Sequence, residues 1–300
     1  MTKCFCSLLL VCYSLMSIAQ STSISYEDKK GNVHLLGSID RSTLEKPPYQ
    51  DWFETEYNKY ELDKEMIEKI NAFYSDDVAV NVYLGTWCGD SRREVTRFLK
   101  IVDHSNMKMS QVSLIGLDGR SEYLKQGPNG EEKGLNIHRA PTFIFYQSGQ
   151  EIGRIVESPL CSLERDIAQI YAGLASEPNY AVANYVFTLF QEKSIAEADT
   201  FLTKNTRYLK RKARGEHELN TLGYVLLRAK EKEKAVVVFK LNTLLFPESA
   251  NTFDSLGEAY METGDFQAAI ENYMKSYQLN PDNTNALLMA KKMLDSKDPG

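Results

Sequence analysis

The sequence predicts an α/β unit with a mixed sheet flanked by helices, followed by an all-α unit of repeated helices. A β-branched apolar run at residues 78–84 is followed, after residues 85–91, by a stretch at 92–102 whose apolar residues recur with helical spacing. A tight turn at 148–150 separates two further strand-like runs. Near the C-terminus, a set of small, aromatic and proline positions recurs at a fixed interval. At about 150 residues per domain, the 300 residues allow two cores.

The elements of the α/β unit follow from periodicity and turn residues. Apolar runs bounded by turn residues predict strands at residues 33–36, 78–84, 112–117, 137–146 and 151–156. Helical spacing predicts helices at residues 62–73, 92–102 and 160–174. Residues 20–31 are polar and are expected to be loose. A helical crossover suits parallel pairing and a tight turn suits antiparallel pairing, so we expect a mixed sheet.

Cys88 lies where the central strand passes into a helix. Unpaired backbone N–H groups and the positive end of the helix dipole meet at such a place. A thiolate is an anion, so this place favours the ionised and reactive form of a cysteine. The alternative is that Cys88 is a small buried apolar residue.

The order strand, Trp87-Cys88-Gly89-Asp90-Ser91, helix resembles the active site of the thioredoxin family. Ala140-Pro141-Thr142 strengthens the resemblance, because a cis-proline before an antiparallel hairpin faces the active-site cysteine in that family. The resemblance implies a thioredoxin-like domain over residues 20–175, with Cys88 and Ser91 as catalytic positions. The implied substrate-binding positions are Trp87, Gly89, Asp90, Arg139, Ala140, Pro141 and Thr142.

The sequence departs from the dithiol members of that family in three places. Ser91 stands where the second cysteine is usual, and a hydroxyl cannot resolve a mixed disulfide as a thiol does. The resemblance therefore implies single-thiol chemistry, in which Ser91 donates a hydrogen bond to the Cys88 thiolate. Asp90 replaces the usual proline, and Val82 replaces a buried aspartate that relays protons. The family's topology separates Cys161 from Cys88 by more than the ~7 Å that a disulfide tolerates, so we expect Cys161 to be packed or idle.

Residues 1–19 have the features of a signal peptide. Lys3 precedes an apolar stretch at residues 8–18, and the small residues Ser17 and Ala19 fit a cleavage site after position 19. An uncleaved anchor is the alternative, although the apolar stretch is shorter than the ~20 residues of a membrane span. We expect an exported protein, periplasmic or secreted, with no membrane span after cleavage.

Composition excludes several classes of function. A lipoprotein anchor at Cys12 is disfavoured, because Val11 precedes it where small residues are usual. The formal net charge of −6 leaves no basic face for nucleic acid. No histidine stands in a Cys/His ligand spacing, so neither a metal nor another cofactor is expected. Cleavage of the signal would leave Cys88 and Cys161 of the 5 cysteines, too few for a disulfide-stabilised fold.

A repeat with an offset of 34 residues marks the C-terminal part. The recurring pairs are Leu222 and Leu256, Gly223 and Gly257, Ala235 and Ala269, Phe239 and Tyr273, Leu245 and Leu279, and Pro247 and Pro281. This pattern resembles tetratricopeptide repeats, in which small residues let paired helices approach and an aromatic ring fills the space between them. We expect repeats at 216–249 and 250–283, with a capping helix at 285–294, in a region spanning 215–296. Residues 176–214 then form a helical linker or a degenerate repeat.

Two functions of different classes fit these observations. In the first, an exported thiol–disulfide oxidoreductase or isomerase uses Cys88 to form mixed disulfides with protein or small thiols, and the repeats recruit a protein partner or peptide. In the second, the chain is a non-enzymatic scaffold whose two units bind protein or peptide without turnover. The sequence leaves open the substrate and whether the repeats bind a partner or only support the chain.

Overall fold

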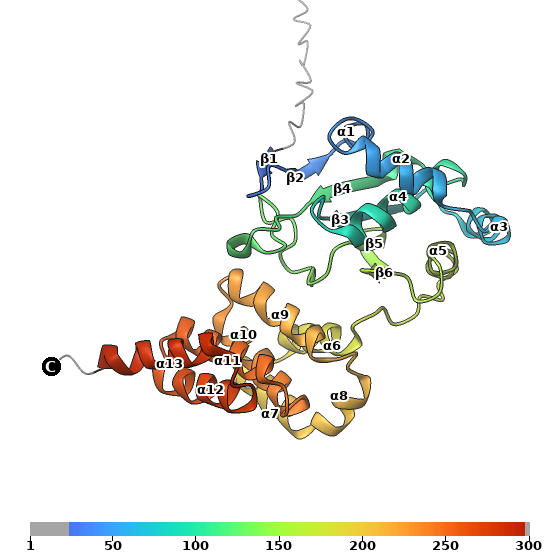
Figure 1. Cartoon of the computed structure of the whole chain (residues 1–300). Helices are drawn as coiled ribbons and strands as arrows, with labels where there is room; N and C mark the ends of the chain where they lie inside the picture. Colours follow the sequence, from blue (N-terminus) through green and yellow to red (C-terminus); the bar gives the residue numbers. More distant parts are fainter. Residues whose placement is uncertain (1–23, 298–300) are drawn as a thin grey trace, which may run out of the picture.

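The structure is a computed structural model that describes residues 24–297. Figure 1 shows two bodies, a sheet unit from β1 to α5 and a helical region from α6 to α13, joined by the chain that follows α5. The predicted signal segment at residues 1–19 lies outside the described residues. Within residues 24–297, no helix combines the length and the apolar character that crossing a membrane requires.

The sheet unit contains a mixed six-stranded sheet with strand order β1-β2-β4-β3-β5-β6. Its strands are β1 (Ile24–Glu27), β2 (Val33–Ile39), β3 (Val78–Leu84), β4 (Val112–Gly116), β5 (Thr142–Gln147) and β6 (Gln150–Val156). β3 and β4 pair in parallel, and β5 runs antiparallel to both β3 and β6. The predicted mixed sheet is confirmed. The expectation that residues 20–31 are loose is wrong at β1, because this edge strand is largely exposed and its polar sequence carries no apolar signal.

One face of the sheet packs against all the longer helices of the unit. The helices are α1 (Arg41–Leu44), α2 (Gln50–Lys59), α3 (Lys64–Phe73), α4 (Gly89–Asp103) and α5 (Leu163–Tyr171), and the short 3-10 turns are η1 (Met109–Gln111) and η2 (Ser121–Tyr123). Val80 and Val82 of β3 enter the same buried cluster as Phe98 of α4. On the opposite face, Tyr83 packs with Ile137 from the segment before β5. Helices of this unit therefore cover only one face, because the turn residues after β4 form a loop instead of a helix.

Two predicted boundaries shift in the structure. The strand expected at 137–146 begins at Thr142, since Pro141 before it has no N–H for the ladder. The helix expected at 160–174 begins at Leu163, because the Ser162 hydroxyl accepts the N–H of Arg165 and caps the helix there. Cys161 is therefore an exposed residue ahead of the helix, and its thiol is free.

The helical region consists of packed helix pairs. Its members are α6 (Ala181–Glu192), α7 (Ile195–Lys204), α8 (Thr206–Lys212), α9 (Glu216–Arg228), α10 (Lys232–Leu245), α11 (Ala250–Thr263), α12 (Phe266–Leu279) and α13 (Thr284–Lys297). Gly223 of α9 lies against the ring of Phe239 in α10, and Gly257 of α11 lies against Tyr273 in α12. The 34-residue offset thus places the same small-residue and aromatic contact in two successive helix pairs.

The buried carboxylate of Glu218 binds the first turn of α6, the first helix of this region. Glu218 of α9 accepts the backbone N–H groups of Val182 at 2.8 Å and Ala183 at 3.0 Å, which are free donors in the first turn of α6. Its second oxygen accepts the N–H of Arg214 at 2.8 Å. A negative charge at a helix N-terminus is stabilised by the helix dipole, so Glu218 joins α6 to α9.

Candidate functional site

Cys88 is the N-cap residue of α4. Its backbone is extended, with φ −95° and ψ 126°, and its carbonyl accepts the N–H of Arg92 at 3.1 Å. The half-buried thiol donates a hydrogen bond to the carbonyl oxygen of Ala140, with a distance of 3.3 Å between Sγ and O. The strand–helix junction and the segment before β5, which are 52 residues apart in the chain, therefore meet at this thiol.

Trp87 is held firmly beside the cysteine. Its indole N–H donates to the carbonyl oxygen of Leu117 at 2.8 Å. The ring lies against the backbone of Gly85 and Gly119, and a Cβ atom at Gly119 would come within 2.7 Å of the ring. Only glycine fits there, so the indole is fixed by the turn that follows β4.

The other residues of the Trp-Cys-Gly-Asp-Ser segment differ in their exposure and in their contacts. Gly89 is exposed, and a Cβ built on it would meet nothing within 4 Å. The Asp90 carboxylate is paired with Arg93 at 2.7 Å, which offsets its charge near the thiol. Ser91 is fully buried, and its hydroxyl accepts the N–H of Gly85 at 3.1 Å. Within residues 24–297 no hydrogen bond joins Ser91 to Cys88, so the hydroxyl fixes the turn that precedes the helix.

The segment before β5 carries the remaining candidate residues. The peptide bond between Ala140 and Pro141 is cis. The carbonyl of Pro141 accepts the N–H of Glu157 at 2.7 Å, and the buried Thr142 hydroxyl donates to the carbonyl of Arg139 at 2.8 Å. Pro141, Thr142 and Ala140 are buried, so of this group the atom presented to the thiol is the Ala140 carbonyl oxygen.

Arg139 turns toward the helical region. Its guanidinium forms an ion pair with Glu157 at 3.2 Å and lies 4.4 Å from the ring centre of Tyr180. It also donates to the backbone carbonyl of His217 in α9 at 2.8 Å. Asn136 makes a second link, because its side-chain amide donates to Asn184 of α6 at 2.8 Å. Arg139 therefore connects the two bodies of the molecule.

Lys125 is a residue of this site that the sequence did not indicate. It lies in the loop after β4 and is only 8% exposed, with its Nζ 5.8 Å from the ring centre of Trp87. Burial lowers the pKa of Lys125 to about 8, and the positive charge of Arg139 adds to this, whereas Cys88 and Glu157 oppose it. No periodicity marks this lysine, so only the folded loop reveals its place.

His138 is buried beside the same segment. Burial, and then the positive charge of Arg139, lowers the pKa of this imidazole to about 3. Its Nδ1 lies 3.2 Å from the amide oxygen of Asn136, and its ring meets Tyr180 edge-on. His138 is therefore uncharged at neutral pH and acts as a packed core residue.

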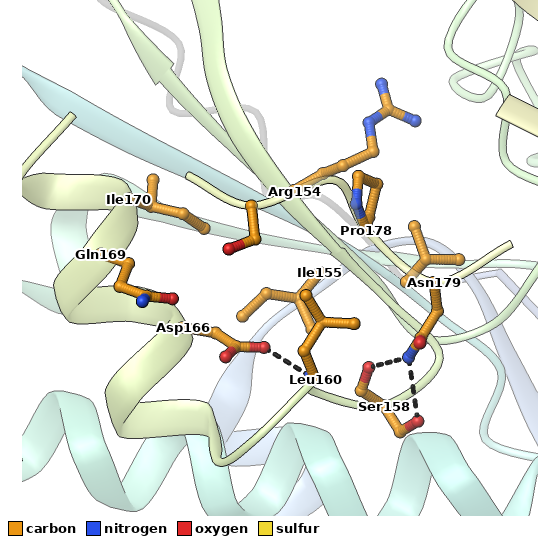
Figure 2. A pocket seen from close by; sticks show the side chains of 11 residues that line it. Arg154, Ile155, Ser158, Leu160, Asp166, Gln169, Ile170, Pro178 and Asn179 are labelled. Carbon is orange, nitrogen blue, oxygen red and sulfur yellow. Dashed lines mark hydrogen bonds between the residues drawn. The ribbon is translucent and has the colours of Figure 1, made fainter. Parts of the chain in front are cut away.

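The pocket shown in Figure 2 is not lined by Cys88 or by the residues around it. That pocket lies between β6, α5 and residues 176–179, and its volume is about 10 Å³, which holds about one water-sized sphere. Asp166 accepts the N–H of Leu160 at 2.6 Å, and Asn179 donates to the carbonyl of Ser158 at 2.7 Å. The bond from Asn179 ties the segment before α6 to the end of the sheet unit, whereas the bond to Asp166 lies within the sheet unit. In the part of the chain that the structure describes, no three His, Cys, Asp or Glu side chains are placed to share a metal ion.

Comparison with known proteins bears on the helix pair α11 and α12, where the second repeat was predicted. Residues 250–283 match the tetratricopeptide repeat family. The chain is also similar to Superkiller protein 3 of Schizosaccharomyces pombe, with 28% identity over 142 residues, which are 47% of this chain and 10% of that protein. It is 36% identical over 62 residues to Superkiller complex protein 3 of Mus musculus, covering 21% of this chain and 4% of that protein. The matched part thus spans one-tenth or less of the length of these relatives.

Proposed function

We propose that the protein is an interaction scaffold whose helical region binds a peptide or a protein partner. The observation that carries this proposal is the tetratricopeptide repeat at residues 250–283. The preceding pair, α9 and α10, repeats its glycine–aromatic contact, so the repeat belongs to a continuous array. Stacked helix pairs of this kind present an extended concave surface for partners. One relative is, by its name, a protein of a complex, which agrees with a scaffold.

A peptide-display screen on the full chain, followed by hydrogen exchange of the bound complex, tests this proposal. We expect enriched peptides to protect amides in α9–α13, with no protection around Cys88. The variant Cys88→Ser is the matched control, and it should bind the same peptides with the same affinity because the scaffold needs no thiol. Failure to enrich any peptide, or protection confined to the sheet unit, would contradict the scaffold.

We propose single-thiol exchange as a second function, carried by a thioredoxin-like sheet unit. The observation in its favour is the half-buried Cys88 thiol at the N-terminus of the 15-residue helix α4, against the carbonyl that precedes Pro141. The Cys88 thiolate attacks one sulfur of a disulfide substrate, a new S–S bond forms, and the departing sulfur leaves with the electron pair. An external small thiol then attacks the mixed disulfide and frees Cys88. Ser91, at the position where dithiol members carry the second cysteine, supplies no thiol for this step and keeps its place in the turn.

Mass spectrometry of a single-thiol variant tests this chemistry. In Cys161→Ser, oxidised glutathione should add one glutathione to Cys88, and dithiothreitol should remove it. The same treatment of a variant that also carries Cys88→Ser should give no adduct. If folded Cys161→Ser protein gains no glutathione adduct at neutral pH, the thiol proposal is contradicted and the scaffold proposal is unaffected.

We also propose that the protein is exported and that its signal peptide is cleaved between Ala19 and Gln20. This rests on the charged, apolar and small-residue order of residues 1–19. N-terminal sequencing of protein recovered from a secreting host should begin at Gln20. Intact Met1 in the recovered protein would contradict the proposal.

A further inference from the structure

Lys125 is a buried ammonium group without an anionic partner. It is 8% exposed, and within residues 24–297 its Nζ makes neither a hydrogen bond nor an ion pair. The Lys125 Nζ lies 5.8 Å from the ring centre of Trp87. Burying an ammonium group is unfavourable unless another group compensates the charge. Such a side chain needs an anion close by, and Trp87 directly precedes Cys88 in the chain.

The other charged groups around the thiol already have partners. Asp90 is paired with Arg93, and Arg139 is paired with Glu157. Arg92 donates to the carbonyl of Thr86 at 2.8 Å, and the buried His138 is neutral because burial lowers its pKa to about 3. This leaves Lys125 and Cys88 as the cation and the ionisable thiol whose charges can compensate each other.

The loop after β4 fixes Lys125 relative to the thiol. The backbone N–H of Lys125 donates to the carbonyl of Asp118 at 2.8 Å, and the N–H of Asp118 donates to the carbonyl of Gln126 at 2.9 Å. The carbonyl of Leu117, the next residue along, holds the indole of Trp87. The lysine and the tryptophan are thus anchored by adjacent residues of one turn. Among the charges that favour protonated Lys125, that of Cys88 acts more strongly than that of Glu157.

We propose that Lys125 is a positioning residue that pairs with the Cys88 thiolate and keeps this thiol reactive at neutral pH. This inference rests on the single-thiol function proposed above. When Cys88 ionises, its proton leaves to solvent, and the charges of the half-buried thiolate and the ammonium compensate each other. When Cys88 enters a mixed disulfide, the ammonium loses that partner. The pair therefore favours release of Cys88 as a thiolate in the second exchange step.

The test is the pH profile of Cys88 alkylation by iodoacetamide, a neutral reagent, in the Cys161→Ser background. A nearby opposite charge shifts an ionisation by about 1–3 pH units. In Lys125→Met we therefore expect the alkylation rate at pH 7 to fall roughly tenfold. Lys125→Arg should restore most of the rate. Lys133→Met, at an exposed lysine of the same loop, should leave the profile unchanged.

The outcomes separate this inference from the function on which it rests. A wild-type profile with the midpoint of a free cysteine, about 8.5, overturns both the thiol chemistry and the role of Lys125. A reactive wild-type Cys88 whose profile is unchanged in Lys125→Met overturns the role of Lys125 alone. Should Lys125→Met fail to fold, nitrogen-15 NMR of the lysine side chains in wild type and Cys88→Ser decides. Loss of the thiolate should lower the titration midpoint of Lys125, and an unchanged midpoint would overturn the pairing.

Discussion

A single methyl group at Gly223 is expected to destabilise the helical region. A Cβ atom there would lie 2.5, 2.6 and 2.9 Å from Cε1, Cζ and Cδ1 of Phe239. The Phe239 ring is fully buried, so it cannot move away without displacing the core around it. Alanine is about 1 kcal/mol better than glycine inside a helix, whereas overpacking costs about 1–3 kcal/mol. Three ring atoms inside 3.0 Å place the cost near the upper end, so Gly223→Ala should lower the unfolding free energy by about 2 kcal/mol.

Gly257 provides the matched control one repeat later. Its Cβ atom would lie 3.0, 3.0 and 3.2 Å from ring atoms of Tyr273, a contact that a shift of a few tenths of an ångström relieves. The gain in helix propensity then offsets the smaller overlap. Gly257→Ala should therefore change the unfolding free energy by less than about 0.5 kcal/mol.

Urea denaturation followed by circular dichroism at 222 nm measures both variants. If Phe239 is the cause, Gly223→Ala combined with Phe239→Leu should lose less than the sum of the two single variants, with a coupling of about 1 kcal/mol or more. Equal losses at Gly223 and Gly257, or additive behaviour of the double variant, would refute the packing argument.

Three further predictions concern the buried polar groups. Glu218→Ala removes the acceptor of three backbone N–H groups and should cost about 3 kcal/mol in urea denaturation, with a smaller loss for Glu218→Gln. His138 has an unfolded pKa of about 6.5 and a folded pKa of about 3, so its contribution to stability is complete above pH 6.5 and is lost as the pH falls toward 3. The wild type should thus lose about 2 kcal/mol between pH 7.5 and pH 5 from this group, and His138→Gln should lack that loss. Arg139→Met should speed limited proteolysis between the two bodies, whereas Arg120→Met, which breaks an ion pair to Asp118 inside the sheet unit, should not; equal cleavage rates would contradict a linking role for Arg139.

Several features followed from local patterns in the chain. The β-branched run of β3, the helical spacing of α4 and the short turn between β5 and β6 each lie within one continuous stretch. Their periods reflect which side chains face a core, so they are readable without the fold. The same patterns did not predict β1, because this edge strand is stabilised by backbone pairing with β2 and buries little apolar surface.

The candidate site was predictable only in part. Cys88 and Pro141 carry recognisable residue patterns, and their neighbourhood follows once β3 and β5 pair. The hydrogen bond expected from Ser91 to the thiolate is absent from the part of the chain that the structure describes, because the hydroxyl bonds to Gly85 instead. A sequence pattern specifies that a polar group is present, but not which of several nearby partners it meets.

The sequence by itself determined the mixed sheet, the strand–helix junction at Cys88 and the 34-residue repeat, because each follows from periodic residue patterns and from the turns between them. Only the tertiary structure decided that Lys125 is buried beside Trp87 and that Arg139 faces α9. These contacts join residues from loops and helices that lie far apart in the chain. Their energies depend on burial and on the charges that the fold brings together, and no local periodicity encodes either of them.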